Sequence, residues 1–205
     1  MVIKKKKIMK TLLLTMLLLS FTVYASTPDF IKSCMDCHGK NGVSVESDVP
    51  TIAGASAAFI EASLFAYKDD IRPAVESKYR SGDTERAATD MKTVTEQLSD
   101  EQILQSAKYF SSKFFITAKQ DFDARLATIG KRIHSKKCQK CHEDGGTSAE
   151  DDSGILAGQW TPYLKESMKH FRDGSRQTDK KMKKKVDKLG DKEWQALLAY
   201  YASQQ

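Results

Sequence analysis

Apolar residues recur every three or four positions along most of this chain, which is the spacing that places them on one face of an α-helix. Five stretches show this spacing: 59–67, 100–111, 121–136, 161–172 and 192–202. Residues that favour helix starts open two of them, Ser99-Asp100-Glu101-Gln102 and Thr161-Pro162. No stretch has the alternation of apolar and polar residues that is typical of a strand, so the pattern predicts an all-α fold.

The helical pattern occurs twice. Tyr163 follows Phe59 by 104 positions, and the same offset relates Cys138 to Cys34. Further on the offset falls to 91, as between Met91 and Met182. The difference of 13 residues indicates an insertion in the first half, in 72–85, where proline, glycine and mixed charges favour a loop. A repeat of this size is a duplicated domain.

The duplication predicts two tandem domains, 26–117 and 118–205, related by approximate twofold symmetry. The connector at 117–120 is short, so we expect the domains to pack directly on one another. Each domain has only about 90 residues and would gain stability from an additional apolar group in its core.

The first 25 residues form a separate segment. Five lysines among the first ten positions precede an apolar run, 11–24, that is too short to span a bilayer comfortably. Val23-Tyr24-Ala25 offers a cleavage site before Ser26, so the sequence predicts a signal peptide at 1–25 and export to the periplasm. An uncleaved membrane anchor is the alternative.

Charge is balanced once this segment is set aside. It holds five of the 33 basic residues and no acidic one, which leaves 28 basic and 27 acidic residues. This balance gives no support to nucleic-acid binding. The halves differ, with 10 basic and 14 acidic residues in 26–117 but 18 basic and 13 acidic residues in 118–205. The asymmetry suggests two faces with different partners.

All the cysteines lie in two copies of one motif, Cys34-Met35-Asp36-Cys37-His38 and Cys138-Gln139-Lys140-Cys141-His142. Two thiols and an adjacent histidine at this spacing fit covalent attachment of a c-type haem, whose iron the histidine binds. A zinc knuckle would favour paired motifs close together, and a redox-active cysteine pair or a disulfide does not need the histidine. We therefore predict two haem c groups, attached through Cys34, Cys37, Cys138 and Cys141, with His38 and His142 as iron ligands.

A methionine thioether would suit the opposite side of each iron and would raise its reduction potential. In the first half Met91 is the candidate, because Met35 lies between the attachment cysteines and cannot reach the other face. In the second half Met182 corresponds to Met91 in the repeat. Met168 and His170 are the alternatives, but we expect Met168 to pack in the core and His170 to lie exposed on a helix.

Two further positions precede the second motif. His134 could be a ligand, but its counterpart Phe30 favours a packing role where the first helix of the domain crosses the last. Gly130 would allow close approach of those helices, facing Tyr200 or Tyr201.

Lysines crowd around Met182, at positions 180, 181, 183, 184, 185 and 188. Such a run is either a solvated loop or a surface that attracts an acidic partner to a nearby haem edge.

Together these motifs resemble class I cytochrome c in its duplicated, cytochrome c4-like form: Cys-x-x-Cys-His, then Ile-Ala-Gly or Leu-Ala-Gly, a helix, a methionine and a last helix. The second half is also similar to the dihaem cytochrome subunit of flavocytochrome c sulfide dehydrogenase, through 118–123, 138–146, 155–164 and 201–205. The resemblance implies a partner, an FAD-containing flavoprotein subunit that oxidises sulfide in the periplasm. It also implies four iron ligands, His38, Met91, His142 and Met182.

Three functions follow from these features. The first is an electron-transfer subunit with no catalytic residue of its own, which takes electrons from the flavoprotein. The second is a free cytochrome c4-like shuttle to a terminal oxidase or a soluble acceptor such as another cytochrome. The third is a haem enzyme, which would need an open or unusual iron site; it is disfavoured because no cysteine is left over and both halves offer a methionine.

Overall fold

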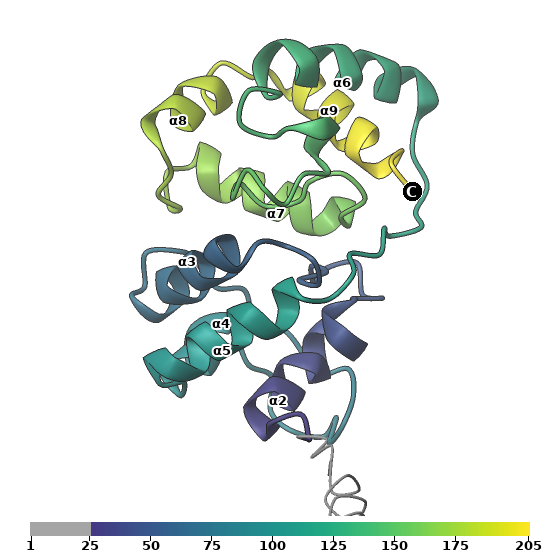
Figure 1. Cartoon of the computed structure of the whole chain (residues 1–205). Coiled ribbons are helices and arrows are strands. Elements are labelled where there is room, and N and C mark those ends of the chain that lie inside the picture. The colour runs from purple at the N-terminus through teal and green to yellow at the C-terminus, as the bar shows by residue number, and fades with distance from the viewer. Residues whose placement is uncertain (1–25) are drawn as a thin grey trace, which may run out of the picture.

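The computed structural model describes residues 26–205, which form two helical halves, one above the other in Figure 1. The first half contains α2 (Asp29–His38), α3 (Ala57–Lys68), α4 (Met91–Glu96) and α5 (Asp100–Ser111). The second contains α6 (Ala124–Lys137), α7 (Thr161–Arg172), α8 (Lys180–Val186) and α9 (Asp191–Ala202). Within 26–205 the one isolated β-bridge joins Ser77 to Thr89, so the all-α prediction is confirmed. The predicted signal peptide, 1–25, lies outside the described residues.

Both offsets of the sequence repeat reappear in the helices. The bounds of α3 and α7 differ by 104 positions, and those of α5 and α9 differ by 91. The packing order is also the same: α2 lies on α5, α5 on α3 and α3 on α4, just as α6 lies on α9, α9 on α7 and α7 on α8. The inserted stretch 72–85 contains no helix, as its composition predicts.

Helix starts follow the capping chemistry of the sequence. At α5 the Ser99 side chain accepts from the Gln102 amide, and the Gln102 side chain accepts from the Ser99 amide, which forms a capping box at the predicted helix start. α6 begins at Ala124 and not at 121, because Asp123 Oδ1 accepts from the backbone amides of Arg125 and Leu126. The apolar pattern does not predict α2, α4 or α8, of which the last two are only six and seven residues long.

Each half has its own small apolar core. In the first half it is formed by Ile31, Ala55, Ile60, Ala107 and Phe110. In the second half it is formed by Ala157, Leu164, Leu189, Leu197, Leu198, Tyr200 and Tyr201. The cysteine-bearing segments contribute to both cores, since Cys34 packs against the first and Cys138 against the second.

The crossing of α6 and α9 depends on Gly130. A Cβ atom at this position would lie 1.9 Å from the carbonyl oxygen of Ala196 and 2.7 Å from Tyr200 Cβ. The predicted contact between Gly130 and Tyr200 is therefore confirmed.

We expect Gly130→Ala to lower the free energy of unfolding of the second half by about 3 kcal/mol, because the clash is with backbone that cannot rotate away. Denaturant unfolding of the haem-loaded protein measures this change. The control is Gly190→Ala, whose Cβ would meet nothing within 4 Å. Its free energy of unfolding should fall by less than about 1 kcal/mol. Equal losses in the two variants would contradict the close crossing.

The two halves pack directly on one another, as the short connector predicts. In the connector the Ala118 amide donates to the Gly158 carbonyl at 2.7 Å, which fixes it to the second half. Across the boundary the Phe59 ring of α3 lies 2.5 Å from where a Cβ of Gly154 would stand. Within 26–205 no helix is long and apolar enough to cross a membrane.

Candidate haem sites

The first cysteine motif lies on the last turns of α2. Cys34, Cys37 and His38 are spaced i, i+3 and i+4, so all three share one face of the helix. The helix ends at His38 because Gly39 adopts a positive φ of 77°. Two thiols and one imidazole can therefore meet the same side of a flat ring.

The second motif continues α6 as a turn. Cys138 is the residue that ends the helix, and its carbonyl accepts from the amides of both Cys141 and His142 at 3.0 Å. These i+3 and i+4 hydrogen bonds again bring both thiols and the imidazole to one side of the chain.

The loop after each motif is also repeated. Gly42 O accepts from the amides of Ile52 and Ala53, and Gly146 O accepts in the same way from Leu156 and Ala157. Gly42 and Gly146 have φ values of 81° and 92°, which favour glycine. The Gly54 amide then donates to α5 and the Gly158 amide to α9, so each loop is tied to the last helix of its own half.

Both motif histidines are buried and suited to bind a metal. Burial lowers the pKa of His38 and of His142, which favours the neutral ring that can bind iron. His38 Nδ1 donates to the Pro50 carbonyl at 2.9 Å, and this leaves the lone pair on Nε2. His142 Nδ1 is buried without a hydrogen-bond partner among the described residues. Both histidines therefore fit a haem iron.

The thiols do not have the properties of a redox pair. Burial raises the pKa of Cys34 to about 11 and also raises the pKa of Cys37 and Cys138, whereas redox-active cysteines have a lowered pKa. None of the four cysteines forms a disulfide within 26–205, so all four can serve as thioether sites. In 26–205 no three His, Cys, Asp or Glu side chains gather as a cation site.

The candidate methionines lie in the equivalent short helices. Met91 is the first residue of α4 and Met182 is the third residue of α8, and both side chains are half-buried. In each half the methionine helix contacts one of the two central helices, and the helix that carries or leads into the cysteine motif contacts the other. Met168 is buried on α7, as expected of a core residue.

The alternative histidine ligands are engaged elsewhere. His134 is buried, accepts from the Tyr201 hydroxyl at 3.0 Å and donates to Gln139 Oε1 at 3.0 Å. It thus has the packing role that the repeat predicts. The expectation that His170 is exposed is wrong: its side chain is 13% exposed, because it folds back on Glu166, 3.1 Å away.

Basic and phenolic side chains meet where the two halves touch. Arg72 is buried, donates to the Tyr163 hydroxyl at 3.3 Å and lies 4.5 Å from the centre of the Tyr67 ring. Burial and then the charge of Arg72 lower the pKa of Arg176 to about 10. Burial acts to raise the pKa of Tyr163, but the two guanidinium charges lower it overall. Among the described residues no carboxylate lies within 4 Å of Arg72 or Arg176.

This cluster carries an excess of buried positive charge, which suits an anion. The two propionates of a haem have the matching charge, so the cluster is a second feature that fits the cofactor.

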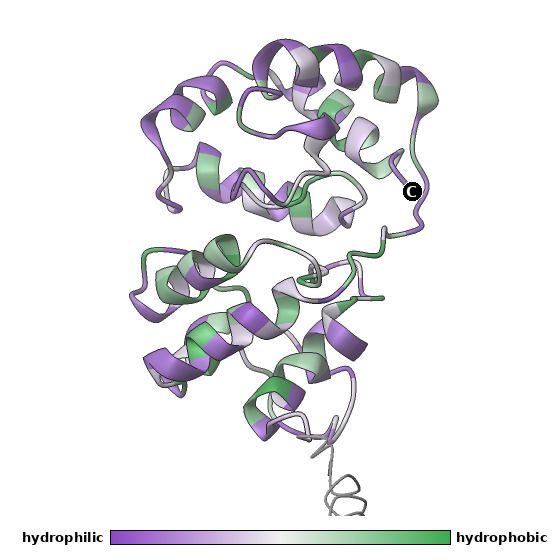
Figure 2. Ribbon diagram, in the orientation of Figure 1, coloured by the Kyte–Doolittle hydropathy of each residue, from purple (hydrophilic) through white to green (hydrophobic). Residues whose placement is uncertain are grey.

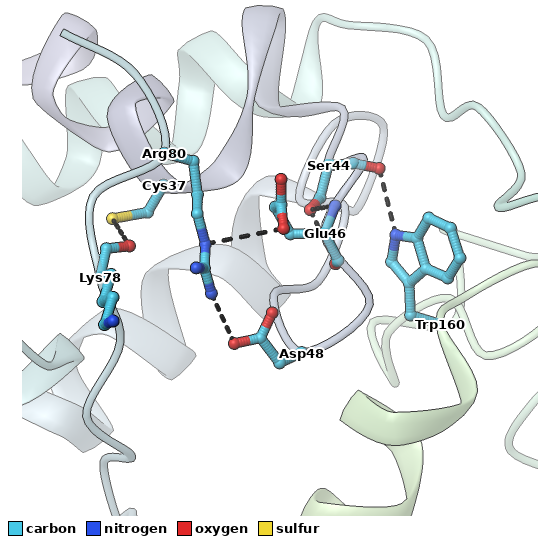
Figure 3. Close-up of polar contacts among 7 residues, drawn as sticks. All are labelled: Cys37, Ser44, Glu46, Asp48, Lys78, Arg80 and Trp160. Atoms are coloured by element: carbon cyan, nitrogen blue, oxygen red, sulfur yellow. Dashed lines mark hydrogen bonds and ion pairs between the residues drawn. The ribbon is translucent and has the colours of Figure 1, made fainter. Parts of the chain in front are cut away.

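The inserted stretch lies against the first motif. The amides of Arg80 and Ser81 donate to the Asp36 carbonyl, and Cys37 Sγ lies 3.8 Å from Lys78 O. The Arg80 side chain pairs with Asp48 at 2.7 Å (Figure 3). The insertion therefore covers the Cys37 side of the first site, and the second half has no counterpart of it.

The lysines around Met182 are on α8 and the turn after it. Most of these side chains are exposed, and Lys183 pairs with Asp187 at 2.5 Å. Figure 2 shows α8 as predominantly hydrophilic. Burial raises the pKa of Cys138, and the charge of Lys185 acts to lower it, so part of this cluster lies near the second attachment site.

Sequence reasoning missed four residues: Pro50, Arg72, Arg176 and Gln159. Arg72 and Arg176 are themselves related by the offset of 104, and this match at the edge of the insertion is the signal that could have identified both arginines. Pro50, four residues before Gly54, offered a weak signal, since a proline fixes the loop that faces the histidine.

Comparisons with known proteins agree with these sites. The family model "Cytochrome c" matches 28–113, and "Cytochrome C oxidase, cbb3-type, subunit III" matches 125–200. Cytochrome c-554(548) of Halomonas halodenitrificans is 34% identical over 89 residues, 43% of this chain and 94% of that protein. Cytochrome c4 of Thiocapsa roseopersicina is 24% identical over 179 residues, 82% of this chain and 84% of that protein. The structure of Acidithiobacillus ferrooxidans cytochrome c4 matches with a TM-score of 0.68 at 26% identity, over 84% of this chain and 99% of that one.

Each half thus combines one attachment motif with one match to a haem-binding family, which makes the molecule a c-type cytochrome with two haem c groups. The chain belongs to the cytochrome c family. Its two cytochrome c domains follow one another as in cytochrome c4.

Proposed function

We propose that the chain is a periplasmic electron shuttle of the cytochrome c4 type. His38 and Met91 would bind the iron of the first haem, and His142 and Met182 that of the second. The observation that carries this proposal is the repeat itself, which gives each domain one attached histidine and one methionine at equivalent positions. The domain boundary would lie between residues 117 and 118, where the Ala118 amide is first bound to the second half.

A haem iron held by histidine and methionine supplies a one-electron couple without an open site for substrate. The chain contributes the rest. Cys34, Cys37, Cys138 and Cys141 would fix the two haems, and Arg72 and Arg176 would face propionates where the domains meet. Direct packing of the domains supports electron exchange within one molecule.

The haem-loaded protein should show two one-electron waves and, when oxidised, a Met–iron charge-transfer band. The reduced protein should not bind carbon monoxide, because both irons already have six ligands. Potentiometric titration and carbon monoxide difference spectra test this expectation. Rapid carbon monoxide binding to the wild-type protein would contradict the shuttle function and favour a haem enzyme.

The second candidate is the cytochrome subunit of a flavocytochrome c sulfide dehydrogenase, with an FAD-containing flavoprotein as partner. It is favoured by the similarity of 118–123 and 155–164 to that subunit. The relatives named above favour the shuttle instead, since they are cytochromes c4 or a smaller cytochrome c. Purification from the native periplasm distinguishes the two. A flavin-bearing chain that co-elutes with the cytochrome favours the subunit. Elution alone, with electron transfer to a soluble acceptor, favours the shuttle.

A further inference from the structure

A side chain of the second domain reaches the loop that holds the first histidine. Gln159 is buried, and its Nε2 donates to the Thr51 carbonyl at 2.6 Å. In return the Thr51 amide donates to Gln159 Oε1 at 3.2 Å. One amide side chain therefore satisfies both backbone groups of Thr51, which fixes the orientation of the peptide groups on either side of it.

Thr51 directly follows Pro50, whose carbonyl accepts the hydrogen bond from His38 Nδ1 at 2.9 Å. The amide group that joins Pro50 to Thr51 thus has two tasks. Its oxygen binds His38 and its N–H binds Gln159 Oε1. A peptide group is planar, so fixing its N–H also fixes the direction of its carbonyl.

The rest of this loop is held from two sides (Figure 3). Trp160 Nε1 of the second domain donates to the Ser44 carbonyl at 3.1 Å. Arg80 of the insertion pairs with Asp48 on the other side. The Ser44 amide in turn donates to the Thr51 hydroxyl at 3.1 Å, so the Trp160 contact and the Gln159 contact act on one connected loop.

The equivalent loop of the second domain has no such support from the first domain. At the offset of 104, Gln159 corresponds to Ala55 and Trp160 to Ser56, neither of which has an amide or indole to reach across. Pro50 corresponds to Gly154, and His142 Nδ1 has no acceptor among the described residues. The support of a histidine by the neighbouring domain therefore runs in one direction, from the second domain to the first.

We infer that Gln159 is a positioning residue for the first haem: by holding the peptide between Pro50 and Thr51, it sets the hydrogen bond on His38 and thereby the reduction potential of that haem. An acceptor on the far nitrogen makes a ligand histidine more basic, which stabilises oxidised iron and lowers the potential. The second domain would then tune the first haem without touching it. This inference rests on the proposed binding of the first iron by His38.

The test is Gln159→Leu in the haem-loaded full chain, followed by potentiometric titration. The reduction potential of the first haem should rise, because its equilibrium constant for reduction becomes about three- to tenfold larger. A tenfold change corresponds to about 59 mV for one electron. The second wave should not move. Met91→Ala should shift the potential of the first haem alone, and this shift shows which wave belongs to which haem. The shifted NMR resonance of the His38 ring N–H should broaden or move, a change that a purely structural role would not require.

Gln205→Leu is the matched control. Gln205 makes the same two-point contact with a backbone, donating to Gln120 O at 2.7 Å and accepting from the Gln120 amide at 3.2 Å, but it does not reach the 44–51 loop. Its removal should leave both waves in place.

A first wave that stays in place, or two waves that shift together, would overturn the inference. If Gln159→Leu does not retain its haems, Trp160→Phe keeps an aromatic ring and removes only the donor to Ser44; it should raise the first wave less, and no shift there would also overturn the inference. A wild-type protein without the Met–iron band would instead contradict the proposed ligands, which do not depend on Gln159.

Discussion

Replacing Met182 with alanine should lower the reduction potential of the second haem by on the order of 100 mV or more, since axial ligands set haem potentials over a range of about 0.8 V. A thioether stabilises reduced iron, and alanine offers no atom in its place. The reduced variant should then bind carbon monoxide at one haem, which a difference spectrum counts. The first wave should stay in place because each domain supplies its own ligands.

The control for this variant is Met168→Leu. Met168 is buried on α7 and is the competing methionine of the second domain. As a core residue it should tolerate leucine for less than about 1.5 kcal/mol of stability and leave both potentials unchanged. If Met182→Ala keeps six-coordinate iron at its native potential while Met168→Leu or His170→Ala shifts the second wave, the assignment of Met182 is wrong.

Helix bounds were predictable where packing and capping act together. Thr161-Pro162 opens α7, and Ser99 caps α5, because these residues satisfy or omit the first free amides of a helix. The duplication supplied a second constraint, since a helix seen in one half had to recur in the other. Gly130 and His134 were interpretable for this reason: both face the last helix of their own domain.

Contacts between the domains could not be predicted in the same way. Gln159 and Thr51 lie 108 positions apart, and no periodicity or repeat relates them. Arg72 is buried between its own domain, where it lies on Tyr67, and α7 of the other domain, where it donates to Tyr163. The expectation for His170 failed for a different reason: Glu166 stands four residues earlier on the same helix, and this spacing, which the sequence analysis did not use, brings its carboxylate to 3.1 Å from His170 Nε2. α2 was missed because much of its surface is polar and only Ile31 and His38 are buried.

The lysines of α8 give the second domain a surface unlike any on the first. The first half carries an excess of acidic residues, and its Cys37 side is covered by the insertion. The lysine-rich helix instead carries Met182 and comes near the second attachment site through Lys185. We expect a soluble acidic acceptor to meet the second haem there, while a flavoprotein partner, if the chain has one, would bind the first domain.

Lys181→Glu with Lys184→Glu should slow electron transfer from the reduced protein to a negatively charged soluble cytochrome by on the order of tenfold at low salt. Both side chains are exposed, and neither has an ion pair among the described residues. The effect should fade as salt rises, because the Debye length falls from about 10 Å at 0.1 M to about 3 Å at 1 M. Stopped-flow rates over a salt series measure it. Lys119→Glu with Lys131→Glu changes the net charge equally at exposed positions on the connector and on α6, and should slow transfer far less. Equal slowing by both pairs of substitutions would show that net charge, and not this surface, attracts the acceptor. If the α8 pair instead releases a flavoprotein and leaves the rate of electron transfer to the acceptor unchanged, electrons enter at the second domain and leave at the first.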